Sequence, residues 1–250
     1  MKRRYLPLFL AVLLAPVLVT RAATQTADEV VEKHLAAMGG REALGKLTTR
    51  KATGTITVST PQGPISGPVE LYSKAPNKTR LYVVLDLTAM GMTDKLTLDQ
   101  KFDGTTGWAL NTLQGDRQIT GNQLDNMKNA TFPNPLLNYK ATGTTVDLLP
   151  NETVAGKSLI VLRITPKIGS VSKLFLDPDT HLAVRSSGIV NSPEMGGDVE
   201  QVSEASDYRT VDGFKIPFKT IQTAGPQTVT IVLEKVEHNV AIDDAMFVVK

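Results

Sequence analysis

The chain has 250 residues, of which 41% are hydrophobic and 21% charged, with 27 Lys and Arg against 25 Asp and Glu. This composition excludes a disordered chain, and the net charge of +2 is too small to indicate a nucleic-acid partner. Cysteine is absent, which excludes disulfides, thiolate metal sites and a cysteine nucleophile.

Residues 1–22 have the three parts of a secretory signal peptide. Residues 2–4 are basic, residues 6–19 are apolar with two prolines, and residues 20–22 supply the small side chains that a signal peptidase reads. The apolar stretch is about 14 residues long, whereas a helix that crosses a bilayer needs roughly 20. We therefore predict export to the periplasm with cleavage after Ala22, and no stable membrane insertion after signal cleavage.

Cleavage also changes the charge of the protein. The signal holds four basic residues, Lys2, Arg3, Arg4 and Arg21, and no acidic residue. Without them, residues 23–250 carry 23 basic and 25 acidic side chains, a net charge of −2. No electrostatic attraction to nucleic acid or to an anionic membrane surface is therefore expected.

The mature chain is predicted to begin with a helix. Thr26 is a suitable N-cap, and two acidic residues follow in the first turn, where the helix dipole favours negative charge. Apolar side chains then recur at helical spacing over residues 30–38, and the glycines at 39–40 end the helix. A short second helix is expected over residues 41–47.

From residue 52 onward the pattern has period two and is rich in Thr, Val and Ile, which predicts strands. Turn sequences divide the strands and no crossover helices separate them, so the pattern favours an antiparallel meander over a parallel sheet. We predict ten or eleven strands in one domain spanning residues 23–250. The strand-like runs are residues 53–59, 68–72, 79–85, 96–102, 107–111, 159–165, 173–176, 181–189, 199–209, 213–223 and 228–238.

The middle of the chain interrupts this pattern. Residues 121–129 predict a short helix, and residues 132–139, which include two prolines, predict an ordered loop packed against the sheet.

Motifs of the common enzyme classes are absent: the sequence has no HExxH, P-loop, GxGxxG or GxSxG. His34, His181 and His238 lie far apart in the sequence, and none has a second metal ligand at i+2 or i+4. We interpret His34 as a solvated histidine on the first helix.

Two acidic pairs remain as candidates for acid–base chemistry. They are Asp177 with Asp179, and Asp243 with Asp244. Both pairs lie in predicted turns, where carboxylates commonly cap backbone N–H groups. We therefore predict that the protein is not an enzyme and has no cofactor and no metal site.

A large antiparallel sheet has two faces, which one or two helices cannot cover completely. Either the sheet curls until it covers itself, or it leaves an apolar hollow suited to a lipid or acyl chain. For each single candidate residue, an ordinary core contact remains the alternative. We assign the apolar cavity and its lid to Met90, Met92, Leu96, Trp108, Leu124, Met127, Phe132, Leu136 and Leu137.

Three segments resemble the LolA-like superfamily of outer-membrane lipoprotein-sorting proteins. They are the helix that ends in Gly-Gly (residues 30–40, VVEKHLAAMGG) and two late segments, residues 207–218 (DYRTVDGFKIPF) and 236–247 (VEHNVAIDDAMF). The resemblance covers nearly all of the mature chain. It implies a mainly β fold, with a single large antiparallel sheet curled into an unclosed half-barrel and the N-terminal and short middle helices as a lid.

The resemblance also has implications for function. It implies that the cavity receives the acyl chains of lipids or lipoproteins. It further implies that an arginine on the sheet latches the lid, and the candidates in this sequence are Arg80, Arg163, Arg185 and Arg209.

Two functions fit these observations. The first is a periplasmic carrier that shields a lipid or lipoprotein acyl chain during transport, without covalent chemistry. The alternative is an envelope sensor or protein-interaction module of the same fold. Such a module would dock another envelope protein through a sheet edge or through residues 132–139.

Overall fold

The computed structural model describes residues 25–88, 91–93, 95–192 and 196–249. The predicted signal peptide, residues 1–22, and the predicted site residue Met90 lie outside the described residues. Within the described ranges, no helix is long and apolar enough to span a bilayer.

Helix α1 (Ala27–Ala37) begins at the predicted N-cap. The Thr26 hydroxyl accepts a hydrogen bond from the Glu29 amide, and the Glu29 carboxylate accepts one from the Thr26 amide. This reciprocal capping box satisfies amide donors that would otherwise be unpaired at the helix start. Val30, Val31 and Leu35 form the buried face of the helix.

His34 is also on this buried face, and the prediction that it is solvated is wrong. Only 3% of the residue is exposed, and its Nδ1 lies 2.9 Å from the carbonyl oxygen of His181. Burial lowers the pKa of His34, because the charged form loses its hydration. The partner lies in a turn 147 residues further along the chain, so local sequence could not indicate it.

A tight turn leads from α1 into α2 (Arg41–Gly45). Both glycines of this turn have positive φ, and a Cβ on Gly39 would lie 2.8 Å from Cδ1 of Phe214. Glycine is therefore required where the helices pass the end of the sheet.

The described residues form thirteen strands, two α-helices before the sheet, and three further helical segments. The segments are α3 (Gly121–Asn129), η2 (Pro135–Leu137) and η4 (Asp244–Phe247). The strands are β1 (Thr49–Thr60), β2 (Gly63–Lys74), β3 (Lys78–Asp86), β4 (Lys95–Phe102), β5 (Gly107–Asn111), β6 (Arg117–Ile119), β7 (Thr145–Val154), β8 (Lys157–Thr165), β9 (Ser172–Leu176), β10 (Ala183–Ser192), β11 (Gly197–Val211), β12 (Phe214–Ala224) and β13 (Gln227–His238).

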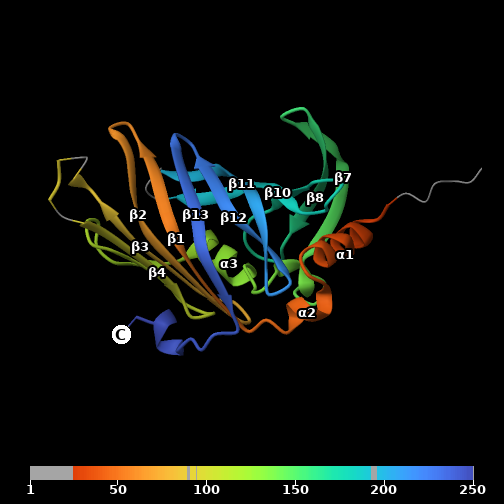
Figure 1. Ribbon diagram of the computed structural model, residues 1–250, viewed down its shortest axis with the longest axis horizontal. Helices are drawn as coiled ribbons and strands as arrows, with labels where there is room; N and C mark the ends of the chain where they lie inside the picture. The colour runs from red at the N-terminus through yellow and green to blue at the C-terminus, as the bar shows by residue number, and fades with distance from the viewer. Residues whose placement is uncertain (1–24, 89–90, 94, 193–195, 250) are drawn as a thin grey trace, which may run out of the picture.

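All these strands belong to one sheet, in the order β6-β5-β4-β3-β2-β1-β13-β12-β11-β10-β9-β8-β7, and each neighbouring pair is antiparallel. Two meanders, β1–β6 and β7–β13, therefore meet where β1 pairs with β13. The sheet is strongly curved and does not close (Figure 1). The predicted fold, a mainly β antiparallel half-barrel with an N-terminal helix and a short middle helix, is confirmed.

Strands β6 and β7 are the two edges of the sheet, although they are consecutive in the chain. Residues 120–144, which we call the connector, must therefore pass from one edge to the other. The connector contains α3 and η2, and α3 lies on the inner side of the curved sheet (Figure 1). The helix over the concave face therefore belongs to the segment that joins the two meanders, and neither meander is interrupted by it.

These two edge strands are also the strands that the sequence pattern missed. β6 has only three residues, too few for a periodic signal. β7 contains Pro150, and its pairing with β8 shifts register between Leu149 and Glu152, as a β-bulge does. Proline is tolerated at such an edge position because no ladder hydrogen bond is required there.

Two glycines allow the backbones to approach closely where the sheet bends. A Cβ on Gly54 would lie 2.1 Å from the Val232 carbonyl oxygen, and one on Gly67 would lie 1.8 Å from the Val84 carbonyl oxygen. The β1–β13 register shifts between Thr53 and Gly54. The curl of the sheet therefore depends on positions without a side chain.

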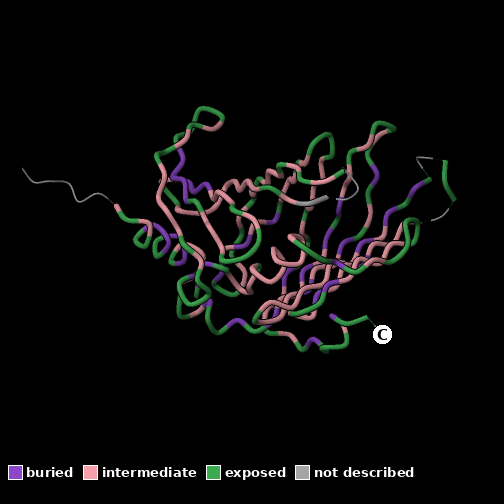
Figure 2. The backbone as a smooth tube through the Cα atoms, turned by 180° about the vertical axis from the view of Figure 1, so that it is seen from behind, coloured by how far each residue is buried: buried purple, intermediate pink, exposed green. Residues whose placement is uncertain are grey.

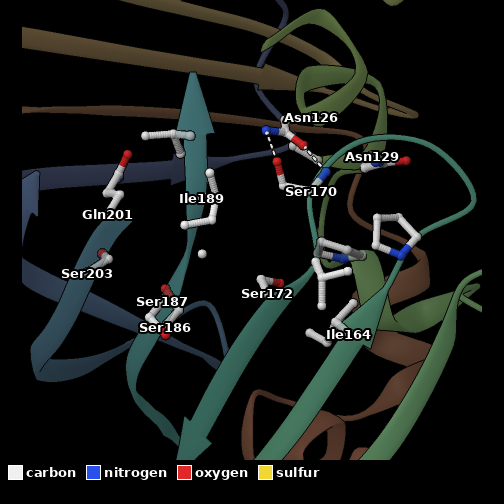
Figure 3. A pocket seen from close by; sticks show the side chains of 16 residues that line it. Asn126, Asn129, Ile164, Ser170, Ser172, Ser186, Ser187, Ile189, Gln201 and Ser203 are labelled. Carbon is white, nitrogen blue, oxygen red and sulfur yellow. Dashed lines mark hydrogen bonds between the residues drawn. The ribbon is translucent and has the colours of Figure 1, made fainter. Parts of the chain in front are cut away.

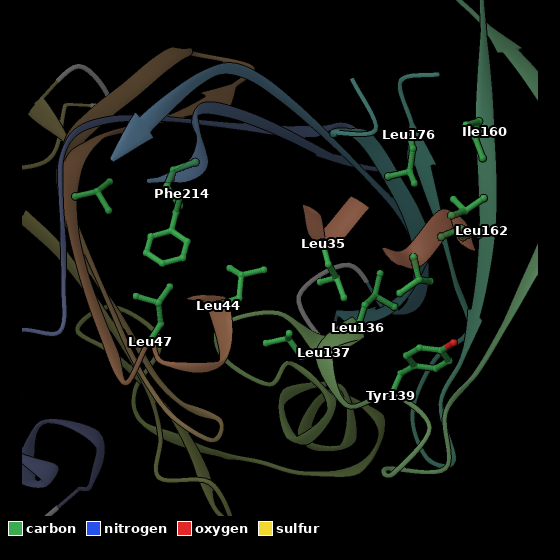
Figure 4. Close-up of a cluster of buried hydrophobic side chains, with 14 of the residues drawn as sticks. Leu35, Leu44, Leu47, Leu136, Leu137, Tyr139, Ile160, Leu162, Leu176 and Phe214 are labelled. Atoms are coloured by element: carbon green, nitrogen blue, oxygen red, sulfur yellow. The ribbon is translucent and has the colours of Figure 1, made fainter. Parts of the chain in front are cut away.

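The main core fills one end of the concave side, where α1, α2 and η2 pack against both meanders (Figure 4). Exposed residues gather in the hairpin turns, while buried stretches run along the strands and α1 (Figure 2). The buried members of this core are Val30, Val31, Leu35, Leu44, Leu47, Ala52, Leu136, Leu137, Tyr139, Ile160, Leu162, Leu176, Phe214, Ile216, Phe218 and Val236.

Candidate ligand-binding hollow

A hollow of about 330 Å³ lies between α3 and the concave face of β8–β11 (Figure 3). Its exposed lining is mainly apolar, and none of the described residues that line it is charged. The lining residues are Asn126, Asn129, Ala130, Pro135, Ile164, Pro166, Ser170, Val171, Ser172, Ser186, Ser187, Gly188, Ile189, Val190, Gln201 and Ser203. We call this space the hollow.

The register of the strands explains the floor of the hollow. Residues that pair directly on antiparallel strands share a face. Ile164 pairs with Ser172, Ser172 with Gly188, and Gly188 with Gln201, which makes one row across four strands. The next row runs from Leu162 through Leu174 and Ser186 to Ser203. Both rows change from aliphatic to small polar side chains as they cross from β8 to β11.

The roof of the hollow is attached to the β8–β9 loop by asparagines of α3. The backbone N–H of Ser170 donates to Asn126 Oδ1 at 2.8 Å. The side-chain Nδ2 atoms of Asn122 and Asn126 donate to Ser170 Oγ at 2.9 and 3.2 Å. Asn129 Nδ2 donates to the Ile168 carbonyl at 2.5 Å. Because Asn122, Asn126 and Asn129 share one helix face, α3 and the loop form a single polar clip.

Three aliphatic side chains in or beside the lining of the hollow are well exposed. Val171 and Ile189, which line it, are 48% and 45% exposed, and Ile168 beside the clip is 44% exposed. Large apolar side chains at such exposure commonly mark a binding surface. These side chains therefore add exposed apolar surface at the hollow.

A second depression, of about 510 Å³, lies at the other end of the concave face, over β3–β6. Leu81, Leu98 and Ala109 contribute apolar surface, but three charged residues also line it: Asp99 of β4, Asp116 of the β5–β6 turn and Arg117 of β6. It lacks a helical roof, since its lining comes from strands and this turn. We therefore regard the hollow as the main candidate site.

The connector is held against the core by charged groups of α1 and α2. The Asp28 carboxylate accepts hydrogen bonds from the Lys140 ammonium and the Tyr139 hydroxyl, and these bonds lower the pKa of Asp28. Arg41 on α2 donates to the Leu137 carbonyl. The N-terminal helices therefore fix the η2 end of the connector.

Arg50 on β1 joins the connector to the sheet. Its guanidinium carbon lies 5.2 Å from the centroid of the Phe132 ring, a cation–π distance. Its Nε donates to His238 Nε2 at 3.1 Å, so the proton of His238 is on Nδ1, which donates to Asp212 Oδ2 at 3.0 Å. Burial without a directly paired carboxylate lowers the pKa of Arg50 to about 10.

None of the four arginines proposed as latch candidates contacts the connector in the way that Arg50 contacts the Phe132 ring. Arg80 forms a two-point ion pair with Asp99 at 2.7 and 2.8 Å. Arg163, Arg185 and Arg209 pair with Asp147, Glu204 and Asp207, respectively. Arg50 was missed because it stands at the start of a strand next to Lys51, a pattern typical of a solvated strand end.

Three predicted site residues lie in the connector and contact the main core rather than the hollow. Leu136 and Leu137 are members of the main core, and Phe132 packs against it as a partly buried side chain. They lie beyond the hollow, near α1, and their lid role stays a prediction.

Two further predicted residues, Leu124 and Met127, are partly buried on α3. Met127 Sδ lies 3.9 Å from Gln100 Nε2, and it would be 3.4 Å from a Cβ on Gly107. Met127 therefore faces the concave side of β4 and β5, on the side of α3 away from β8–β11.

The remaining predicted residues do not converge on one site. Leu96 packs in an aliphatic cluster of β1–β4, and Met92 is 39% exposed in a loop. Trp108 pairs with Lys101, which pairs with Arg80, so this row lies on the convex face. None of the eight described residues of the predicted set lines the hollow.

One carboxylate of each acidic pair caps backbone amides as predicted, whereas Asp179 and Asp244 form ion pairs with lysines. The Asp177 carboxylate accepts hydrogen bonds from the amides of Asp179 and Thr180, and Asp243 accepts one from the amide of Ala245. An ion pair with Lys157, together with the amide bonds, lowers the pKa of Asp177 to about 2. Among the described residues, no cluster of three or more acidic or histidine side chains could hold a metal ion.

Comparison with solved structures gives the class of fold. A LolA superfamily protein from Nitrosomonas europaea superposes with a TM-score of 0.58 at 12% identity, over 90% of this chain and 98% of that one. A DUF1329 family protein from Desulfovibrio piger gives a TM-score of 0.58 at 14% identity, over the same shares. A putative outer membrane lipoprotein-sorting protein domain from Vibrio parahaemolyticus gives 0.55 at 11% identity, over 88% and 94%.

At these identities the likeness shows the fold alone: the chain has a LolA-like fold. No protein-family model and no curated protein matches the sequence.

Proposed function

We propose that the protein is a periplasmic carrier that shields one acyl chain of a lipid or lipoprotein in the hollow, without covalent chemistry. The observation that carries the proposal is the space itself, whose exposed lining is mainly apolar, with Ile164 of β8 and Val171 of the β8–β9 loop on one side and helix α3 as its roof. Export rests on the sequence of residues 1–22, and the LolA-like fold is consistent with a carrier.

The size of the hollow sets the expected affinity. About 330 Å³ accommodates roughly ten groups of the size of a water molecule or a methylene. Burying about ten methylenes contributes roughly 8 kcal/mol. Association itself costs roughly 4–15 kcal/mol, so the net affinity of one chain is modest. Reversible binding of this kind suits a carrier that must release its ligand.

The alternative, docking of another protein through a sheet edge or residues 132–139, has less support. The β6 edge is three residues long, and the β7 edge is interrupted by Pro150 and its bulge, two features that discourage strand addition. Leu136, Leu137 and Tyr139 are buried, so residues 132–139 do not present these side chains to a partner.

Titration of the protein with a fluorescent acyl probe tests the proposal. Two variants on the same strand, β11, serve as a matched pair. Ser203→Phe fills the hollow from β11, whereas Ser206→Phe lies on the opposite, exposed face of the same strand. We expect binding to fall at least tenfold in Ser203→Phe and to persist in Ser206→Phe. Equal binding by both variants, or no probe uptake together with no lipid in native mass spectra, would overturn the proposal.

A further inference from the structure

Four uncharged polar side chains on the sheet side of the hollow have free hydrogen-bonding groups. Ser172, Ser186, Ser203 and Gln201 have no side-chain hydrogen bond to any described residue. No buried side-chain nitrogen or oxygen in the described ranges lacks a partner, so these four groups are open to the space of the hollow.

These groups stand together on the sheet side of the hollow. Ser186 pairs with Ser203, and Gly188 pairs with both Ser172 and Gln201. Gly188 has no side chain, and a Cβ there would lie only 3.3 Å from Ser172 Cβ, so the backbone of β10 approaches the polar side chain of β9 closely. We call Ser172, Ser186, Gln201 and Ser203 the polar row. The asparagines on the roof are already engaged with Ser170 and Ile168, so the polar row holds the free donors and acceptors.

The cations of β8, β9 and β10 that stand next to the hollow-facing residues point away from the hollow. Arg163, Lys173 and Arg185 alternate with hollow-facing residues of β8, β9 and β10, so the strand period places them on the convex face. Each is also paired with a carboxylate: Arg163 with Asp147, Lys173 with Glu152 and Arg185 with Glu204. An anion in the hollow would therefore lose its water without gaining a counter-charge.

This arrangement discriminates between head groups. A neutral carbonyl or hydroxyl can exchange its hydrogen bonds with water for bonds to the polar row at little net cost. An ionised carboxylate or phosphate without a buried partner is strongly disfavoured.

We propose that the hollow is specific for an acyl chain joined through a neutral ester or amide, whose carbonyl binds the polar row, and that it rejects free fatty acids. This inference rests on the proposed carrier function and assigns the chemical class of its ligand. The ester would come from a glycerolipid, and the amide from an acylated protein terminus.

Three probes with the same chain distinguish these cases: monolauroylglycerol, an N-lauroyl dipeptide amide, and laurate at about pH 8, where its carboxylate is ionised. We expect both neutral probes to bind the full mature protein at least tenfold more tightly than laurate. The preferred neutral probe identifies the ester or amide source.

Two sets of variants assign the discrimination to the polar row. Ser186→Ala with Ser203→Ala removes two hydroxyls, and we expect a three- to tenfold loss of affinity for the neutral probes with little change for laurate. Ser203→Lys places a cation in the hollow, and we expect it to raise laurate affinity at least tenfold. Ser206→Lys, on the exposed face of the same strand, is the control and leaves laurate binding unchanged. Circular dichroism and thermal melting confirm that each variant is folded.

The outcomes separate the two proposals. If no probe binds the unmodified protein, the carrier function fails and this inference fails with it. If all three probes bind with similar affinity, or if the alanine and lysine variants leave the preference unchanged, the ligand class is overturned while the carrier function stands.

Discussion

The concave face has two walls that differ in chemistry although they belong to one sheet. On β1–β4 and β13 the inward side chains are aliphatic, and Ile56, Val69, Val83 and Leu85 are buried against one another. On β9–β11 the inward positions near α3 hold serines, glycine and Gln201. The hollow lies against the second wall.

This difference shows how an open site survives in a chain that folds by apolar burial. Two aliphatic surfaces in water gain free energy by closing on each other, so Ile56, Val69, Val83 and Leu85 pack together without a space between them. The second depression, over β3–β6, stays open where charged groups join Leu81 and Leu98 in its lining. A wall of small polar side chains gains little by closing, because each hydroxyl must keep a hydrogen-bonding partner. We infer that the aliphatic wall stabilises the fold and the polar wall keeps the site open.

The largest expected effect concerns the bend that closes the aliphatic wall. A methyl group at Gly67 would overlap the Val84 carbonyl oxygen, so Gly67→Ala must displace backbone of β3. We expect a loss of several kcal/mol in the free energy of unfolding. Gly45→Ala is the control, because a Cβ there meets nothing within 4 Å and alanine favours helix by up to about 1 kcal/mol. Urea unfolding of both variants measures the contrast, and equal stabilities would refute this account of the bend.

The walls themselves can be compared by truncating one residue on each. Leu85 is 2% exposed in the aliphatic wall, so Leu85→Ala should cost about 2–5 kcal/mol of stability. Ser186→Ala, in the polar wall, should change stability by no more than about 0.5 kcal/mol while weakening probe binding. Chemical denaturation gives the first quantity and probe titration the second. A large loss of stability in Ser186→Ala would contradict the division of roles.

The same contrast explains how far sequence reasoning reached. The alternation of apolar residues predicted the strands of the aliphatic wall and eleven of the thirteen described strands in all. This was possible because period-two alternation can be read within a few consecutive residues. The polar row was missed, since Ser186, Gly188 and Ser203 read as ordinary solvent-facing strand positions. Only the register across β8–β11, together with the return of α3 over them, makes those positions the lining of a hollow.

Long-range partners also account for the contacts that the sequence did not indicate. Apolar residues of the connector were assigned to the ligand because they looked exposed in a proline-rich loop, yet α1 and α2 bury Leu136 and Leu137. His34 is buried by a turn distant in sequence, and Arg50 meets Phe132 only through the connector's path. In each case the deciding contact joins residues that no local window contains.

A smaller effect is expected at the clip that roofs the polar wall. Asn126→Ala removes both side-chain bonds to Ser170, at a cost of about 1–3 kcal/mol. We expect faster release of a bound acyl probe, measured by stopped-flow displacement, because the β8–β9 loop is no longer tied to α3. Asp125→Ala on the same helix, which loses only a 3.6 Å ion pair with Lys128, is the control. Unchanged release rates in Asn126→Ala would show that the clip does not control access.

The smallest effect concerns pH, at His238, where β13 pairs with β1, and at His34 on α1. Burial lowers the pKa of His238 and of His34 below the ordinary value of 6.5. The unfolded chain therefore binds protons at these sites more readily than the folded protein. Their contribution to stability is fully present above about pH 6.5 and is lost progressively as the pH falls through that value toward the lower folded pKa values.

For His238 the physical cause is desolvation first, opposed by the hydrogen bond to Asp212 and reinforced by the Arg50 charge. Replacing both histidines by glutamine removes these two titrations, and the amide can still donate a hydrogen bond. We expect the free energy of unfolding, measured in urea between about pH 7.5 and 5.5, to fall less steeply in the double variant than in the natural protein. Asn126→Ala, which touches neither histidine, should keep the natural slope. If the double variant also keeps that slope, these histidines are not the source of the pH dependence.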